Sequence, residues 1–363
     1  MKRRVRVLSL LLVLVLVLAL AACGKKETAE DVSPSPSPSG TAAPSSPSPE
    51  VTPVPGGPVN PLTGEAMDEE KIAARPIAIM LNNIKQALPQ LGNSQADIIY
   101  EVLAEGGITR LLGVYQSVEG VGEIGSVRSS RPYYLELALG LDAIYMHAGG
   151  SEAAYANIKN WNVTALDCVR TTAYSGVFWR DQGRIKKNGL EHSVLTSGEA
   201  ITEHFPDYSF RQTHEEGFSL PYAYAQELVL ADGEPANTVT VPFSRYKTGV
   251  FRYDEETKKY LVEEYGAPFI DGNTGEQLAF TNVVVIRTGC RTIDDYGRMA
   301  VDLSGYSGDG IFAVGGKYIP ITWEKEDLNS PIVYKIPEGE DVTFAVGNCY
   351  VNIIPDTNDV TVE

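Results

Sequence analysis

The stretch DAIYMHAGGSEAAY, Asp142–Tyr155, is the one that decides how the first half of the chain is expected to fold. It reads as a short apolar strand that ends near His147, a turn at Gly149–Gly150, and a helix that opens on Ser151, a preferred N-cap residue. Side chains alternate along a strand, so Tyr145 and His147 would share one face. This strand-to-helix turn is typical of α/β sheets, in which ligands bind at the carboxyl ends of strands.

The neighbouring stretches extend this pattern. RPIAIMLNN, Arg75–Asn83, is short and apolar like a buried strand, and two β-rich runs flank Gly106–Gly107, which favours a hairpin. Pro132 suits the first position of a helix that follows Arg131. We therefore predict an N-terminal α/β domain over residues 60–230.

The sequence pattern changes after about residue 235. Short strand-like runs such as NVVVIRT and CYVNIIP follow one another, separated by glycine-rich and charged turns. This spacing predicts a β-rich, mainly antiparallel C-terminal domain over residues 235–355. The expected fold class of the whole chain is thus a mixture of α and β, of the α/β or α+β type.

The first residues predict export. Residues 1–22 begin with four basic side chains and continue with the apolar run Val7–Ala22, which is short for a membrane span of ~20 residues and typical of a signal peptide. LAACG, Leu20–Gly24, resembles a bacterial lipobox and implies cleavage before Cys23 and a lipid such as palmitate on Cys23. The alternative is an uncleaved anchor. Either form places the protein at the cell membrane, on its extracytoplasmic face.

Residues 23–59 are rich in serine and proline and nearly free of large apolar side chains. Such a segment cannot bury enough surface to offset its chain entropy, so we expect a disordered tether. At ~3.1 Å per residue where it is polyproline-like, it would reach on the order of 100 Å. It could carry the folded part into or through a cell wall.

Charge and cysteine content narrow the function classes. The chain has 47 acidic and 30 basic residues and a net charge of −17, and signal cleavage would make it more negative. This charge argues against nucleic acid or an anionic membrane surface as the main partner, although a local basic pocket is compatible with it. Cys168, Cys290 and Cys349 allow at most one disulfide and show no CxxC spacing, so we expect no metal site and no cofactor. The GxSxG, SxxK and HExxH motifs are absent.

GEIGSVRSSRPYY, Gly122–Tyr134, is the first candidate site. Arg128 and Arg131 precede the predicted helix, and guanidinium groups beside free N–H groups suit a phosphate or a carboxylate. The alternative is that both arginines pair with Glu123 and Glu136. His147 is the second candidate: it either lines a site or, as a buried, hydrogen-bonded histidine, ties down the turn.

Two further clusters complete the candidates. Val177–Ser193 combines Trp179, Arg180, Asp181 and His192, and an aromatic face beside planar hydrogen-bonding groups suits sugars or peptides. A solvated loop with a weak Arg180–Asp181 pair is the alternative. Around the first glycine pair lie Glu101, Glu105 and Arg110. Glycoside hydrolysis needs two carboxylates at a defined separation, so an ion pair that braces the turn is the favoured interpretation.

Taken in order, NPLTG, RPIAIMLNN, IGSVRSSRPYYLELAL, DAIYMHAGGSEAAY and FWRD closely resemble the N-terminal part of the YerB-like lipoproteins. TGEQLAFTNVVVI and the final YVNIIP resemble that family's C-terminal part, and the resemblance covers about residues 60–355. It implies an extracytoplasmic lipoprotein with a two-part α/β-type fold, whose N-terminal part is a layered sandwich, and it brings no established activity.

The resemblance also selects polar positions. The family's characteristic polar residues correspond here to Glu105, Arg110, Arg128, Arg131, His147, Arg180, Asp181 and His192. Two places depart from the family pattern. Glu191-His192-Ser193 stands where Pro-His-Asn is common, and Phe269 stands where a histidine is usual. We therefore expect no mechanism that depends on that second histidine.

Three functional hypotheses follow. The first is a tethered envelope lipoprotein that binds a wall glycan, an anionic polymer or a partner protein, with no catalytic residue. Its pocket would be lined by Arg128, Arg131, His147, Arg180 and His192. The second is a metal-independent hydrolase, with His147 or His192 as the acid or base and Asp181 or Glu105 as the carboxylate. The third is a structural protein whose arginines each pair with a local acid.

Overall fold

The computed structural model describes residues 50–54 and 56–363. The predicted signal peptide, the predicted lipidation of Cys23 and the part of the predicted tether up to residue 49 lie outside the described residues. Strand β1 (Glu50–Pro53) falls within the segment predicted to be disordered, and the structure instead pairs it antiparallel with β10 (Ala223–Val229). Of the helices within the described ranges, none has the length and apolar character needed to cross a membrane.

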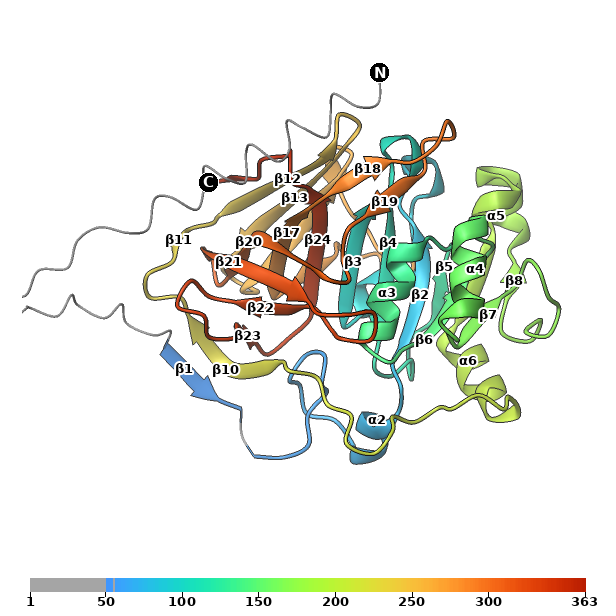
Figure 1. The fold of residues 1–363 in the computed structure, drawn as a ribbon, viewed down its shortest axis with the longest axis horizontal. Coiled ribbons are helices and arrows are strands. Elements are labelled where there is room, and N and C mark those ends of the chain that lie inside the picture. The colour runs from blue at the N-terminus through green and yellow to red at the C-terminus, as the bar shows by residue number, and fades with distance from the viewer. Residues whose placement is uncertain (1–49, 55) are drawn as a thin grey trace, which may run out of the picture. The chain divides into compact units, whose positions relative to one another are not determined.

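An eleven-stranded sheet forms the centre of the fold (Figure 1). Its order is β11 (Glu234–Pro235), β21 (Lys317–Lys325), β20 (Tyr306–Val314), β17 (Asn282–Thr288), β24 (Cys349–Pro355), β3 (Ile98–Leu103), β4 (Thr109–Tyr115), β2 (Ile77–Asn82), β6 (Ile144–His147) and β7 (Ala165–Asp167), with β22 (Val333–Lys335) paired to β21. The sheet takes strands from both predicted domains, because β24 lies between β17 and β3 and pairs in parallel with each.

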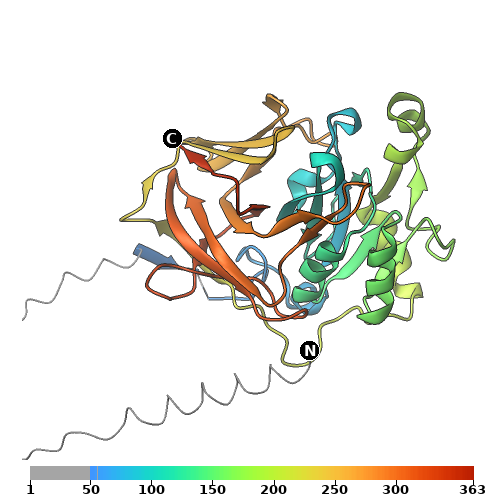
Figure 2. The same ribbon diagram turned by 45° about the horizontal axis from the view of Figure 1, so that its top comes forward.

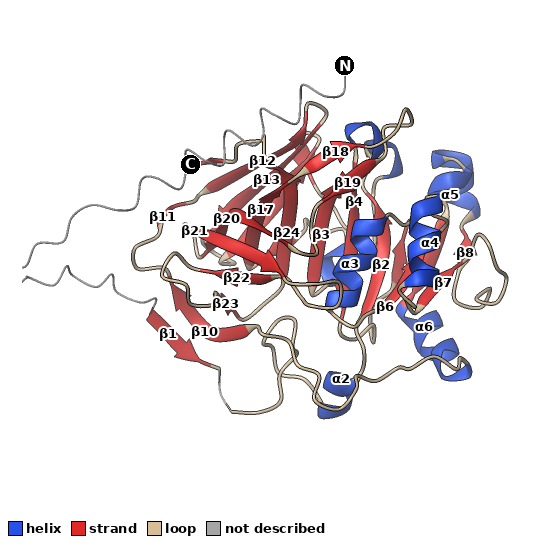
Figure 3. Ribbon diagram, in the orientation of Figure 1, coloured by secondary structure: helices blue, strands red, loops and turns tan. Residues whose placement is uncertain are grey.

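Smaller sheets and short helices surround this sheet. A second sheet contains β12 (Thr238–Ser244), β13 (Lys247–Asp254), β14 (Lys259–Glu264), β15 (Ala267–Pro268), β16 (Ala279–Phe280) and β25 (Thr361–Val362). Three minor sheets are β1–β10–β23 (Thr343–Ala345), β5 (Glu123–Gly125)–β9 (Val194–Ser197)–β8 (Trp179–Arg180), and the hairpin β18 (Cys290–Thr292)–β19 (Met299–Val301). The α-helices are α2 (Glu69–Ala73), α3 (Pro132–Gly140), α4 (Glu152–Asn160), α5 (Gln182–Asn188) and α6 (Gly198–His204). Figure 3 shows that α3 to α6 gather around β2, β6 and β7, whereas the C-terminal half is built of strands. The predicted α+β class, with an α/β N-terminal part and a strand-rich C-terminal part, is confirmed.

Strand direction defines where a site can form. Strands β2, β3, β6, β7, β17 and β24 run parallel to one another, and β4 runs antiparallel between β2 and β3. The carboxyl ends of β2, β3 and β6 therefore meet at one edge of the sheet, which we call the carboxyl edge. The predicted hairpin around Gly106–Gly107 is the β3–β4 connection, and it lies at this edge.

The two faces of the sheet carry separate cores. One face, here the α3 face, packs against α3, and the other, the β12 face, packs against β12 to β14; the turned view of Figure 2 shows those hairpin strands as a separate layer. Tyr145 belongs to the core of the α3 face, and Ile144 and Met146 belong to that of the β12 face, as the alternation in the sequence predicts. The Ser151 side chain caps α4 by accepting a hydrogen bond from the Ala154 N–H at 3.2 Å, also as predicted.

Candidate anion-binding site at the carboxyl edge

The segment that carries Arg128 and Arg131 is held between the diverging ends of β2 and β6. The Arg128 N–H donates to the Met80 carbonyl at 2.8 Å, and the Ala148 N–H donates to the Arg128 carbonyl at 3.0 Å. The segment thus hydrogen-bonds to one strand on each side, which fixes it at the carboxyl edge. Pro132 then starts α3 directly after Arg131.

Glu105 lies between two guanidinium groups. Arg131 forms a fork on it, with Nε 3.1 Å from Oε2 and one Nη 2.6 Å from Oε1, while Arg110 pairs with the same Oε1. The other Nη of Arg110 donates to the Ser129 carbonyl at 3.0 Å. Burial alone would raise the pKa of Glu105, but Arg110 and Arg131 lower this pKa to about 2. The carboxylate is therefore ionised, and the expected Glu105–Arg110 ion pair is present.

Arg128 stands next to this pair. It donates to the Glu191 carbonyl at 2.6 Å, and its guanidinium lies 3.5 Å from the Glu191 carboxylate, which is 69% exposed. Burial and the nearby charge of Arg110 lower the pKa of Arg128. The Nε atoms of Arg110 and Arg128 are buried without a hydrogen-bond partner among the described residues. The structure thus pairs Arg128 and Arg131 with Glu191 and Glu105, rather than with the Glu123 and Glu136 considered from the sequence.

His192 is buried next to Arg128. Its Nδ1 lies 2.8 Å from the Asn82 side-chain nitrogen and accepts a hydrogen bond from it, so the ring proton of the neutral form is on Nε2. Nε2 lies 3.3 Å from a carboxylate oxygen of Glu191 without hydrogen-bond geometry. Burial, and next the charge of Arg128, lower the pKa of His192. A neutral, oriented imidazole therefore adjoins the arginines.

His147 has a different setting. Its Nδ1 donates to the Gly149 carbonyl at 2.7 Å, and its ring lies beside that of Tyr145, with centroids 5.4 Å apart. The Gly149 N–H in turn donates to Asp167 at 2.9 Å. Burial lowers the pKa of His147, so the ring is neutral at physiological pH. These contacts hold the turn in place, which is the alternative that the sequence left open.

Arg180 and Asp181 brace the loop that carries His192. Arg180 donates to the Leu190 carbonyl at 2.7 Å, and Asp181 accepts from the Arg184 N–H at 2.6 Å as the N-cap of α5. The structure thus joins Glu105, Arg110 and Arg131 directly and places Arg128 and His192 alongside them. For the hydrolase hypothesis, Asp181 is engaged as a cap and Glu105 by guanidiniums, so neither is the carboxylate partner of a histidine.

Sequence reasoning missed a second polar cluster, on the β12 face of the same edge. Lys247 Nζ lies 3.1 Å from Glu101 Oε1 and 2.5 Å from Glu264 Oε1, and the Asn83 amide donates to both carboxylates at 2.9 and 3.0 Å. All four side chains are essentially inaccessible to solvent. Burial raises the pKa of Glu264; Lys247 opposes this shift and Glu101 reinforces it. Glu101 was noted in the sequence only as a neighbour of Glu105 and Arg110. The paired asparagines of LNN were a further signal, because neighbouring side chains on a strand face opposite ways.

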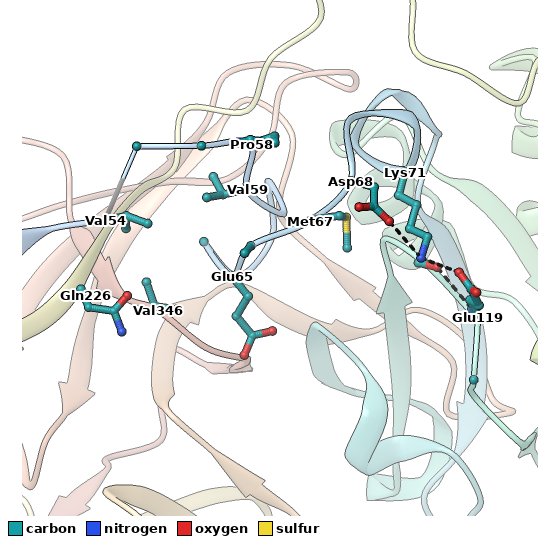
Figure 4. Close-up of a pocket in the computed structure, with 16 residues that line it drawn as sticks. Val54, Pro58, Val59, Glu65, Met67, Asp68, Lys71, Glu119, Gln226 and Val346 are labelled. Carbon is teal, nitrogen blue, oxygen red and sulfur yellow. Dashed lines mark hydrogen bonds and ion pairs between the residues drawn. The ribbon is translucent and has the colours of Figure 1, made fainter.

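Two hollows of the structure lie away from these residues. Figure 4 shows one of about 900 Å³, lined in part by Val59, Met67, Val346 and the Lys71–Glu119 ion pair. Another, of about 790 Å³, is lined by Trp179 and several glutamates. Neither hollow is lined by any of the eight candidate residues.

Metal and disulfide chemistry find no support in the same part of the chain. Within residues 50–54 and 56–363, no three His, Cys, Asp or Glu side chains are grouped so as to hold a metal ion. Cys168, Cys290 and Cys349 are free thiols.

Comparison with known proteins places the chain in a class of two-part proteins without an assigned activity. Residues 62–211 match the family model described as "Protein of unknown function (DUF3048) N-terminal domain", and residues 239–351 match the model of the corresponding C-terminal domain. The chain therefore belongs to the DUF3048 family.

Two similar proteins support this assignment. "Putative lipoprotein YerB" of Bacillus subtilis (strain 168) is 30% identical over 310 residues, which cover 83% of this chain and 88% of that protein. The crystal structure of the YerB protein from Bacillus subtilis matches with a TM-score of 0.73 at 27% identity, over 84% of this chain and 99% of that one. The resemblance to YerB-like lipoproteins is thereby confirmed.

Proposed function

We propose that the protein is a lipid-anchored envelope protein on the extracytoplasmic side of the cell membrane, and that its carboxyl edge binds an anionic envelope polymer. The arginine cluster carries this proposal: Arg110, Arg128 and Arg131 converge at the edge, and two of their Nε atoms have no hydrogen-bond partner among the described residues. Buried N–H groups of guanidiniums that lack a hydrogen-bond partner favour an anionic ligand. The lipobox at Cys23 and the name of the Bacillus subtilis relative support the lipid anchor.

Charge at the edge supports an anionic ligand. The segments that meet there, residues 83–87, 105–110, 126–131, 180–193, 244–246 and 294–298, are richer in basic than in acidic residues. The basic residues are Lys85, Arg110, Arg128, Arg131, Arg180, Arg184, Lys186, Lys187, Arg245 and Arg298, against Glu105, Asp181, Glu191, Asp294 and Asp295. In a chain with a net charge of −17, this local excess of positive charge would attract anions while the remaining surface repels them.

Sedimentation with purified sacculi tests the proposal. The full chain, purified from membranes in detergent, is mixed with sacculi that carry or lack their attached anionic polymers. We expect the wild type to sediment with the polymer-bearing sacculi, and Arg128→Ala to weaken binding roughly tenfold, because a hydrogen-bonded charge contributes about 1.5 kcal/mol. Arg252→Ala is the matched control: it removes the same charge from an ion pair between the exposed Arg252 of β13 and Glu263 of β14, and it should bind like the wild type.

Two results would contradict the proposal. Equal loss in both variants would mean that binding depends on total charge and not on the carboxyl edge. Failure of the wild type to sediment with either preparation would exclude the polymer and direct attention to a protein partner, to be sought by pull-down from membrane extracts.

A further inference from the structure

The geometry around Glu105 shows which kind of anion the arginines fit. A carboxylate already occupies the space between them, with both of its oxygens bound by the Arg131 fork and one also bound by Arg110. Planar, bidentate contact of this kind is how guanidinium recognises carboxylate. Arg110 is 3% exposed, and its Nε nevertheless lacks a partner among the described residues. Glu105 thus satisfies this guanidinium only in part.

The segment that holds Glu105 can move without disturbing the core. Glu105 is the most exposed member of the trio and opens the 3₁₀ turn Glu105–Gly107. Gly106 and Gly107 both have positive φ, 69° and 79°, and a Cβ at Gly106 would meet nothing within 4 Å. A turn of two glycines with open space beside it can swing the carboxylate outward at little steric penalty.

A matched ion pair at the opposite edge of the sheet shows what a purely structural arrangement looks like. Asp142, just before β6, is held by His214, with Nδ1 2.8 Å from its carboxylate, and by two arginines, Arg75 and Arg211. Burial alone would raise the pKa of Asp142, but the His214 hydrogen bond and the two arginines lower this pKa to about 2. The Arg75 guanidinium is fully used: it donates to three carbonyl oxygens and to the Thr164 hydroxyl. No glycine pair adjoins Asp142, and no atom of Arg75 is left without a partner.

Exposed tyrosines flank the Glu105 turn. Ser244 donates to the Gly107 carbonyl at 2.6 Å, and Tyr246, 60% exposed, lies against Gly107. The tip of the β18–β19 hairpin reaches Gly106 through Gly297 and carries Tyr296, which is 78% exposed. Amphipathic aromatic rings at the rim of a polar site suit the flat faces of sugar rings.

We propose that Arg110 and Arg131 form a seat for a ligand carboxylate, that Glu105 fills this seat in the free protein, and that a carboxylated glycan binds by displacing Glu105. The proposal rests on the proposed function and adds to it the class of ligand and the residue that competes with it. Because the resident carboxylate keeps the binding-competent state sparsely populated, it weakens the apparent affinity by the same factor. Glu105 is therefore a positioning residue for the guanidiniums and an internal competitor of the ligand.

Removing the competitor tests the proposal. Binding of a fluorescent oligogalacturonate is compared for the full-length wild type, Glu105→Gln and the control Asp142→Asn, which neutralises the equivalent carboxylate at the other edge. We expect Glu105→Gln to bind roughly tenfold more tightly than the wild type, because the competitor no longer carries charge. Asp142→Asn should bind like the wild type. Inorganic polyphosphate, a flexible anion without carboxylates, should gain much less from Glu105→Gln.

A measurement on the wild type tests the proposal even if Glu105→Gln does not fold. The carboxyl carbon of Glu105 is followed by NMR while pH is lowered, with and without oligogalacturonate. Displacement should raise the pKa of Glu105 from about 2 toward its ordinary value, because the carboxylate leaves its two guanidiniums. An unchanged pKa in the presence of bound ligand would overturn the proposal.

The outcomes separate the two proposals. If Glu105→Gln binds no better than the wild type while Arg128→Ala still weakens binding to sacculi, the edge binds the polymer but the seat is not its site. Two control results would show that the effect is one of net charge and that the carboxylate seat is wrong. In the first, Asp142→Asn binds oligogalacturonate as tightly as Glu105→Gln does. In the second, Glu105→Gln increases the affinity for polyphosphate as much as the affinity for oligogalacturonate. If neither the wild type nor Glu105→Gln binds oligogalacturonate, the proposed ligand class is wrong.

Discussion

Two polar clusters lie back to back at the carboxyl edge, on opposite faces of one sheet. Asn82 faces His192 on the α3 face, whereas its neighbour Asn83 faces Glu101 and Glu264 on the β12 face. The β12-face cluster around Lys247 is sealed from solvent, whereas the α3-face cluster around Glu105 is reached by solvent and has more guanidiniums than buried acids. The two clusters therefore share paired charges but differ in their access to solvent.

The difference lies in what each cluster connects. Asn83 and Glu101 come from the part of the chain that matches the N-terminal family domain, and Lys247 and Glu264 from the part that matches the C-terminal one. The sealed cluster thus joins the two parts of the fold. The open cluster involves only the N-terminal part and borders exposed loops. We accordingly expect changes to the sealed cluster to alter stability and changes to the open cluster to alter binding.

Lys247→Met should have the largest effect. It removes the one cation from the sealed cluster and leaves the carboxylates of Glu101 and Glu264 buried without it, which typically destabilises a protein by about 3–5 kcal/mol. Chemical denaturation of the wild type and the variant measures this loss. A loss below about 1 kcal/mol would contradict a structural role for the sealed cluster, because the cluster would then stabilise the fold no more than a surface ion pair does.

Glu264→Gln should change how stability depends on pH. The folded-state pKa of Glu264 is raised above its ordinary 4.5, so the contribution of this group is fully present below pH 4.5 and is lost as pH rises through the raised pKa. The loss amounts to about 1.4 kcal/mol for each unit of pKa shift. The variant should lack this decline. Its free energy of unfolding, measured relative to that of the wild type, should therefore increase as pH rises. Parallel pH profiles would show that Glu264 keeps an ordinary pKa.

Asp181→Ala should cost about 1 kcal/mol of stability, the usual effect of losing an N-cap, and should leave polymer binding unchanged. The structure gives Asp181 the role of capping α5, although the family pattern had marked it as a candidate ligand-binding residue. Thermal unfolding and the sacculus assay together decide between these roles. A loss of binding in a variant that is folded at the assay temperature would return Asp181 to the site.

Arg128→Ala should have the smallest effect on stability, about 0.5 kcal/mol or less, because its acidic partner Glu191 is exposed. Its effect on binding is expected to be the larger one, which is the reverse of the pattern for Lys247→Met. Measuring unfolding and binding on both variants therefore sharpens the contrast between the two clusters. Destabilisation of Arg128→Ala by several kcal/mol would instead mark the open cluster as structural.

Local elements of the fold were predictable because they depend on neighbours in sequence. The Ser151 cap, the Pro132 helix start and the β3–β4 hairpin follow from turn and capping preferences over a few residues. The β24 strand was recognisable as a strand, but its place between β17 and β3 was not, because pairing between residues far apart leaves no local signal.

The candidate site shows the same limit. Arg110 and Glu105 are close in sequence, and their ion pair was expected. The Glu105–Arg131 fork and the Arg128–Glu191 contact depend on the placement of one segment between β2 and β6, which spacing alone does not reveal. Lys247 could not be identified as a site residue from the sequence, because a lysine near a hairpin is ordinarily solvated. Only the tertiary fold buries it.

The position of β24 has a consequence for how the molecule is made. This strand spans Cys349–Pro355, far along the chain from its neighbour β3, and it fills the middle of the large sheet. A chain synthesised from its N-terminus holds β3 with one unpaired side until β24 has emerged, and exposed strand edges invite association between chains. The sheet is therefore completed only after long loops have closed, which slows folding, and a truncation that removes β24 would leave the central sheet split.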